Sequence, residues 1–157
     1  MDPTFHDLLK QRYDYESWKN TTTLDRDLHI TKFSFTGREF PGWQLQRVDR
    51  SDSAAGPFHQ SIWKRYEDEL LSVNVLECAS RAAAHEAIIE FLGEFQSPMI
   101  ARQTTGAAGD VAFAMPGETA VLFARANLVV LLRNAGPKIT ELGTLARGFD
   151  QFLMRVE

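Results

Sequence analysis

The chain has 157 residues, of which 44% are apolar and 24% are charged, and its formal net charge is −4. This length suits a single globular domain, residues 1–157, that buries roughly 70% of the surface of its unfolded chain. The acidic balance argues against nucleic acid and anionic membrane surfaces as partners, because both attract basic proteins.

The sequence also bears on the compartment in which the protein works. No run reaches the roughly 18 apolar residues that a membrane span needs, and the N-terminal residues show neither the basic nor the apolar region of a signal peptide. Cys78 is the only cysteine, so no intrachain disulfide can form, which fits a reducing compartment. We therefore expect a cytoplasmic protein, although an exported protein whose signal has been removed would show the same features.

The first half of the chain predicts a short helix followed by four strands. Thr4 and Asp7 have the spacing of a capping box for a helix that ends near Tyr13. The polar segment Asp14–Asp25 is expected to form a loop, and Ser51–Pro57 a surface loop. The strands are expected at Leu28–Phe35, Trp43–Val48, Gln60–Tyr66 and Leu70–Leu76.

The second half predicts two longer helices with strands between them. Apolar residues recur at helical spacing over Ser80–Phe95, and again over Thr140–Val156. Between the helices, Met99–Gln103 and Val111–Met115 are expected to be short strands that flank the glycine-rich turn Thr104–Asp110.

The most apolar stretch, Thr119–Arg133, is expected to form the central hairpin of the sheet. Two apolar runs, Ala120–Ala124 and Leu128–Leu132, are separated by Arg125-Ala126-Asn127, where Asn tolerates the backbone of a tight turn. Both runs are apolar at consecutive positions, which is typical of strands that are covered on both faces.

The order strand, turn, strand, helix occurs twice, over Ile62–Phe95 and over Val121–Leu153. This predicts an α+β fold, with an antiparallel sheet of about seven or eight strands and two long helices packed on one face. The short N-terminal helix completes the fold, and the two blocks are either a ββα pseudo-repeat or a common way of building such a unit.

One longer pattern resembles that of uncharacterised bacterial α+β domains, some of which are exported lipoproteins. It consists of Trp63-Lys-Arg, an acidic turn, Leu71-Ser-Val-Asn-Val, a helix, Gly109-Asp-Val-Ala-Phe-Ala and Leu122-Phe-Ala-Arg-Ala-Asn-Leu-Val-Val, and it extends to Leu153. The resemblance implies the fold class and no common activity. This chain lacks the signal peptide and lipidation cysteine of the exported members.

Motifs that would define an enzyme are missing or incomplete. His85-Glu86 could begin a zinc-binding helix, but the position of the second histidine is occupied by Ile89. The segment Thr104–Asp110 lacks the Lys and Ser or Thr of a phosphate-binding loop. Cys78 at a helix start, paired with His29 or His59, is the one nucleophile arrangement to consider, and a packed structural cysteine is the alternative. We therefore predict no catalytic residue, metal or cofactor.

Aromatic residues are concentrated before position 67, where they alternate with basic side chains. Aromatic rings near Arg side chains suit a ligand cleft or a protein interface, although the same rings could simply fill the core. The candidate binding residues are Trp18, Trp43, Trp63, Tyr66, Arg47 and His59. They lead to the hypothesis of a non-enzymatic binding or protein–protein interaction domain that uses an aromatic-rich N-terminal sheet surface.

The expected partner is a protein or a second copy of the chain, in a homodimer that makes contact through strands between Leu28 and Tyr66; the sequence does not identify a small-molecule ligand. Two other functions stay open. One is a small enzyme with its site between the N-terminal strands and the loop at 14–25, and its candidate acids and bases are His29, His59, Asp49 and Glu67. The other is a structural or assembly subunit of a larger complex. A pocket that gathers the titratable groups would favour the enzyme, and a flat aromatic patch the interaction domain.

Overall fold

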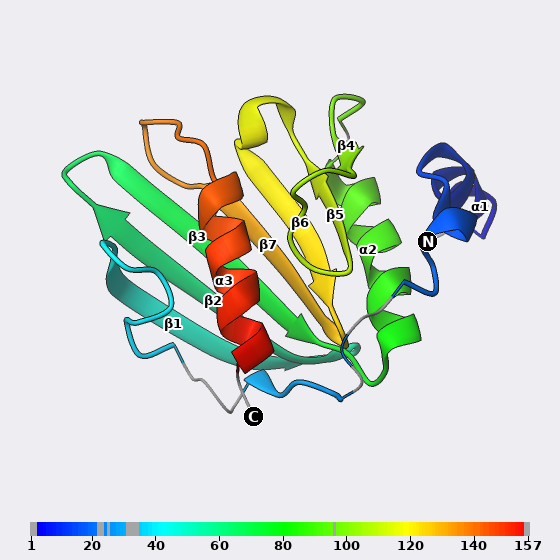
Figure 1. The fold of residues 1–157 in the computed structure, drawn as a ribbon, viewed down its shortest axis with the longest axis horizontal. Helices are drawn as coiled ribbons and strands as arrows, with labels where there is room; N and C mark the ends of the chain where they lie inside the picture. Colours follow the sequence, from blue (N-terminus) through cyan, green and yellow to red (C-terminus); the bar gives the residue numbers. More distant parts are fainter. Residues whose placement is uncertain (1–2, 22–23, 25, 31–34, 96, 156–157) are drawn as a thin grey trace.

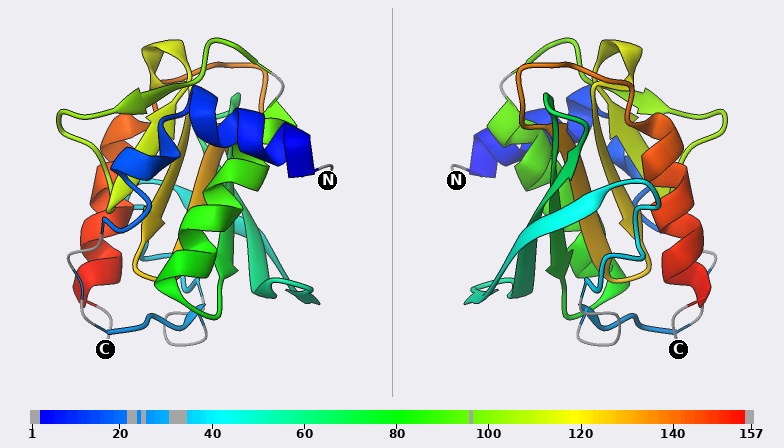
Figure 2. Two further views of the ribbon diagram at one scale, coloured as in Figure 1. Left: turned by 90° about the vertical axis from the view of Figure 1, so that its right-hand side faces the viewer. Right: turned by 90° about the vertical axis from the view of Figure 1, so that its left-hand side faces the viewer.

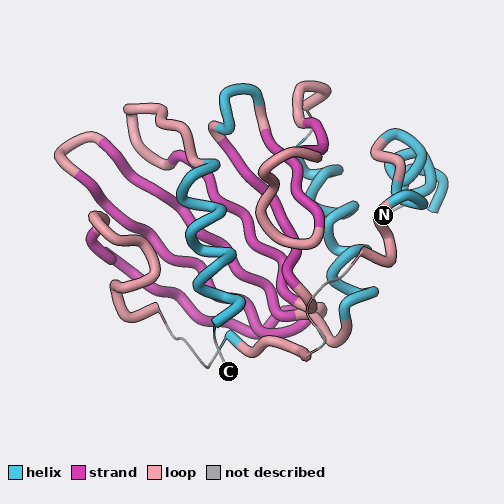
Figure 3. Tube along the Cα trace, in the orientation of Figure 1, coloured by secondary structure: helices cyan, strands magenta, loops and turns pink. Residues whose placement is uncertain are grey.

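The computed structural model describes residues 3–21, 24, 26–30, 35–95 and 97–155. Within these residues it has three α-helices and one seven-stranded antiparallel sheet, so the fold is α+β as predicted (Figures 1 and 3). The helices are α1 (Pro3–Arg12), α2 (Arg81–Phe95) and α3 (Gly143–Arg155). The strands are β1 (Gln44–Ser53), β2 (Gly56–Arg65), β3 (Glu69–Glu77), β4 (Ala101–Gln103), β5 (Val111–Ala114), β6 (Ala120–Arg125) and β7 (Leu128–Asn134). None of the helices in the described ranges is long and apolar enough to cross a membrane.

The strand order is β1-β2-β3-β7-β6-β5-β4, so two antiparallel meanders meet where β3 pairs with β7. The predicted hairpin at Thr119–Arg133 is confirmed as β6 and β7, which pair from Ala120 with Arg133 to Arg125 with Leu128. Ala126 occupies the turn with φ 53°. This hairpin supplies the middle of the sheet, as its apolar sequence predicts.

The turn residue Asn127 connects three separate parts of the chain. Its side-chain oxygen accepts the backbone N–H of Leu28 at 2.6 Å, and its nitrogen donates to the carbonyls of Leu28 and Cys78 at 2.9 and 3.1 Å. The backbone N–H of Cys78 in turn donates to the Asn127 carbonyl at 2.8 Å. The central hairpin therefore fixes both the segment before β1 and the start of α2.

The two long helices cover opposite faces of the sheet, so the prediction that they share one face is wrong (Figure 2). On β6 and β7, Val121, Phe123 and Val130 belong to the core under α3. Leu122 and Leu131, which point the other way, belong to the core under α2. The physical reason is the run of consecutive apolar residues on these strands, because each face then needs its own cover. The ββα blocks consequently place their helices on different sides and do not form a structural repeat.

The N-terminal helix packs on α2 rather than on the sheet. Glu86 of α2 accepts hydrogen bonds from Lys10 at 2.8 Å and from the Tyr15 hydroxyl at 3.1 Å, and it lies 3.0 Å from the His6 ring nitrogen Nε2. Burial, followed by the charge of Glu86, raises the pKa of Tyr15 to about 12. This polar contact attaches α1 to α2. Trp18, in the turn that follows α1, belongs to the core under α2.

Two predicted segments differ most from the structure. Leu28–Ile30, the described start of the predicted first strand, is not a strand, and residues 31–34 lie outside the described ranges. The predicted loop Ser51–Pro57 belongs mostly to β1 and β2, whose hairpin pairs Ser53 with Gly56. A two-residue turn is enough here because Gly56, with φ 138°, adopts a backbone that other residues avoid.

Candidate functional site

Four of the six candidate binding residues lie in the protein interior. Trp18 and Trp63 are 0% exposed, Trp43 is 5% exposed and His59 is 4% exposed. Trp18 packs in the core under α2, whereas Trp43 and Trp63 pack in the core under α3. The structure therefore does not gather these rings on one sheet surface, and their area stabilises the fold instead.

The two remaining candidates, Tyr66 and Arg47, are exposed. Arg65 lies between the rings of Trp43 and Tyr66, with its guanidinium carbon 4.6 and 5.4 Å from their centroids. Its Nε donates to Glu69 at 2.7 Å. These contacts engage the Arg65 side chain within the protein. We therefore interpret them as structural contacts between β1, β2 and β3.

The four candidate acids and bases are not all gathered together, although His29 and His59 both have Glu77 as a neighbour. Desolvation, together with the nearby Arg50, lowers the pKa of His59, whose Nδ1 has no hydrogen-bond partner. His29 lies 3.2 Å from Glu77, and Asp49 pairs with Arg47 at 2.9 Å on an exposed strand. Glu67 is exposed in the turn between β2 and β3, at the other end of β2 from His59.

The loop after α1 begins at the end of the sheet that is farthest from the N-terminal strands. Ser17 accepts a hydrogen bond from Arg102 of β4 at 3.0 Å, and Trp18 meets Phe113 of β5 edge to face. Ser17 and Trp18 thus lie at the β4–β5 end of the sheet, whereas Leu24, later in the same loop, packs against the core under α3.

Cys78 is a packed residue in the core under α2, and it is 4% exposed. Burial, with smaller contributions from Glu90 and Glu77, raises the pKa of its thiol to about 11. This raised pKa is opposite to the shift that a helix start would produce on a reactive thiol. In the described ranges, moreover, no group of three or more His, Cys, Asp or Glu side chains could hold a metal ion.

A buried ionic cluster lies where the central hairpin meets α3. Arg125 donates two hydrogen bonds to Asp150, at 2.7 and 2.9 Å, and one to Asp110 at 3.0 Å. Asp150 Oδ2 also accepts the backbone N–H of Gly109, and the second oxygen of Asp110 accepts the backbone N–H of Ala126, each at 2.8 Å. The guanidinium and both carboxylates bind one another and nearby backbone groups. The geometry of the cluster therefore indicates a structural role.

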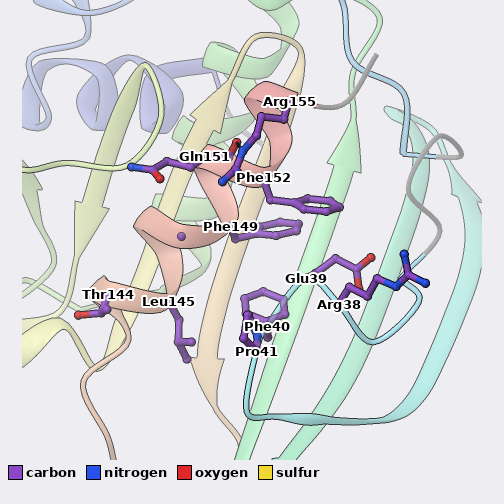
Figure 4. A pocket seen from close by; sticks show the side chains of 11 residues that line it. Arg38, Glu39, Phe40, Pro41, Thr144, Leu145, Phe149, Gln151, Phe152 and Arg155 are labelled. Carbon is purple, nitrogen blue, oxygen red and sulfur yellow. Dashed lines mark hydrogen bonds between the residues drawn. The ribbon is translucent and has the colours of Figure 1, made fainter.

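A groove lies between α3 and the loop at residues 38–41 (Figure 4). Its volume is about 650 Å³. Phe149 stacks on Phe40 at 5.0 Å between ring centroids and on Phe152 at 6.1 Å, so three rings form one wall. Phe152 is its half-buried outer ring, and Phe40 and Phe149, at 1% and 0% exposed, are packed behind the surface. Gly148 borders the same groove, and a Cβ added there would meet no atom within 4 Å.

Arginines are the charged residues at the rim of the groove. Arg38 is exposed on the loop and Arg155 is exposed in the last turn of α3. The lining carboxylate, Glu39, is 4% exposed and turned into its own loop, where it accepts hydrogen bonds from the backbone N–H groups of Thr36 and Gly37 at 3.0–3.1 Å. The groove therefore combines an aromatic wall with a basic rim.

Sequence reasoning missed this groove. Its rings come from two distant segments, Phe40 from the loop before β1 and the others from α3. Helical periodicity had assigned Phe149 to the core stripe, which the structure confirms, since it is 0% exposed. The available signal was Gly148, a residue of low helix propensity in the middle of an amphipathic helix.

Comparison of the chain with known protein families, with curated proteins and with solved structures finds no match. The fold and the groove are thus the observations from which function has to be argued.

Proposed function

We propose that this domain is a non-enzymatic binding module that holds a small apolar molecule in the groove between α3 and the loop at residues 38–41. The observation that carries the proposal is the stacked wall of Phe40, Phe149 and Phe152 beside an open volume of about 650 Å³. This volume lies within the roughly 300–1,000 Å³ of small-molecule sites, which are lined mainly by apolar and aromatic side chains.

Neutral N-phenyl-1-naphthylamine, whose fluorescence rises in apolar surroundings, tests the proposal. We expect the wild-type protein to bind it saturably with a stoichiometry of one. Gly148→Gln should weaken binding about tenfold or more, because the new side chain enters the groove. Phe152→Ala should also weaken it, because one ring of the wall is lost.

Glu90→Gln supplies the matched control, since it places the same side chain on an exposed position of α2. Urea denaturation of each variant checks that the fold is retained. Binding that does not saturate, or that is the same in Gly148→Gln as in the wild type, would remove the groove as the site.

The protein partner expected from the sequence stays a proposal as well, and β1 is the surface that favours it. β1 is the edge strand of the described sheet, and it carries the exposed residues Arg50 and Asp52. In antiparallel pairing about a two-fold axis, opposite residues point to the same face. When two copies of β1 pair with Ser51 opposite Ser51, Arg50 of each copy lies opposite Asp52 of the other copy. The bulge at Gln46 lies outside the paired stretch. We propose a weak homodimer formed in this register.

Charge exchange tests this homodimer by sedimentation velocity at micromolar to millimolar concentration. Arg50→Asp and Asp52→Arg should each be monomeric, because like charges then face each other across the axis. An equimolar mixture of the two variants should form a heterodimer, in which each opposed pair again has opposite charges. A wild type that stays monomeric, or single variants that still dimerise, would contradict the register.

The cytoplasmic location inferred from the sequence stays a prediction.

A further inference from the structure

The accessible charge at the rim of the groove is positive, because both lining arginines are exposed and the lining carboxylate is buried. Two arginines, Arg38 and Arg155, border it, whereas the formal net charge of the chain is −4. The lining carboxylate of Glu39 is engaged by the backbone N–H groups of its own loop and is 4% exposed. A ligand at the mouth of the groove therefore meets guanidinium groups and no free carboxylate among the described lining residues.

Neither guanidinium is held by an acidic partner among the described residues. Arg38 extends from the loop beside the groove, with no hydrogen bond or ion pair to another described residue (Figure 4). Arg155 donates to the Gln151 carbonyl at 3.2 Å, a bond within its own helix that uses only Nε. Both side chains thus keep donors for an external acceptor.

We propose, on the basis of the proposed groove, that the ligand is an amphipathic anion. Its acyl or aromatic body lies on the wall formed by Phe40, Phe149 and Phe152, and its carboxylate or sulfonate lies at the rim, where it meets Arg38 or Arg155. A guanidinium presents paired N–H donors that match the two oxygens of such a head group. The rings supply affinity and the arginines select the charged head over a neutral one.

Two fluorescent probes that differ by one charged group separate this inference from the existence of the groove. N-phenyl-1-naphthylamine is neutral, and 8-anilinonaphthalene-1-sulfonate has the same ring skeleton with a sulfonate added. We expect the wild type to bind the sulfonate about tenfold more tightly than the neutral probe, as one charge-assisted contact would give. The double variant Arg38→Gln/Arg155→Gln should abolish this advantage and leave binding of the neutral probe unchanged.

Arg47→Gln is the matched control, because Arg47 is an exposed arginine on β1, away from the groove. It should retain the full preference for the sulfonate. Raising the salt concentration should reduce the preference, since exposed charges are screened. Competition with decanoate against 1-decanol extends the comparison to a carboxylate, and decanoate should displace the neutral probe at lower concentration.

The outcomes separate the two claims. Equal affinity of the wild type for both probes, or loss of the preference in Arg47→Gln, overturns the anion inference alone. Failure of the neutral probe to bind the wild type overturns the groove and the inference together.

Discussion

Replacing Arg125 by alanine is expected to lower the free energy of unfolding by about 3–5 kcal/mol. The change removes the cation but leaves Asp110 and Asp150 in place, with side chains that are 0% and 9% exposed. Two carboxylates without a counter-charge are then buried near each other, and this is more destabilising than the loss of the hydrogen bonds alone. The midpoint and slope of urea denaturation at neutral pH measure the effect.

The matched control is Arg147→Ala, whose ion pair with Glu118 at 3.3 Å is partly exposed. An exposed pair contributes only about 0–1 kcal/mol. The double variant Arg125→Ala/Asp150→Asn should regain part of the loss, since one uncompensated charge disappears with the second substitution. Equal stability of Arg125→Ala and Arg147→Ala would show that the cluster is not buried as described.

The second large effect is expected for Trp18→Ala, which should lower the free energy of unfolding by about 3–5 kcal/mol. Trp18 is 0% exposed, and its indole N–H donates to the Tyr13 carbonyl at 2.8 Å. Its ring also meets Tyr15 and Phe113 edge to face, at 4.9 and 5.5 Å between centroids. Truncation leaves a large cavity between the N-terminal segment and β5.

Tyr66→Ala is the comparison for Trp18→Ala, because Tyr66 is 75% exposed and should change stability by no more than about 0.5 kcal/mol. Thermal unfolding followed by far-ultraviolet circular dichroism measures both. If Trp18→Ala unfolded with the wild-type midpoint, Trp18 would belong to a contact surface, as the sequence hypothesis had it, and not to the core.

Local patterns in the sequence predicted the elements well and their arrangement less well. The apolar stripe from Ala84 to Phe95 identifies α2, and the consecutive apolar runs of β6 and β7 correctly indicate strands covered on both faces. The same observation rules out two helices on one face, because a single covered face would leave Leu122 and Leu131 in water. The two ββα blocks have the same order of elements along the chain. This similarity led to the wrong prediction that their helices share one face.

The candidate site was less predictable because exposure depends on contacts between distant segments. Nothing local distinguishes Trp63, which is enclosed by Phe40 at 4.9 Å, from a tryptophan on a binding surface. The groove arises only when the loop at 38–41 meets α3, and Gly148 alone does not predict which distant segment lies beside it.

The hydrogen bonds of the Asn127 side chain can form only after most of the chain has been synthesised. Its hydrogen-bond partners Leu28 and Cys78 precede it by 99 and 49 positions. At about 5–20 residues per second, the ribosome takes roughly 2–10 s to pass from Cys78 to Asn127. During that time β3 has no β7 to pair with, and its apolar residues Leu71 and Val73 have no partner strand on that side. Until residues 128–134 have been synthesised, β3 therefore has β2 as its one partner strand in the described sheet.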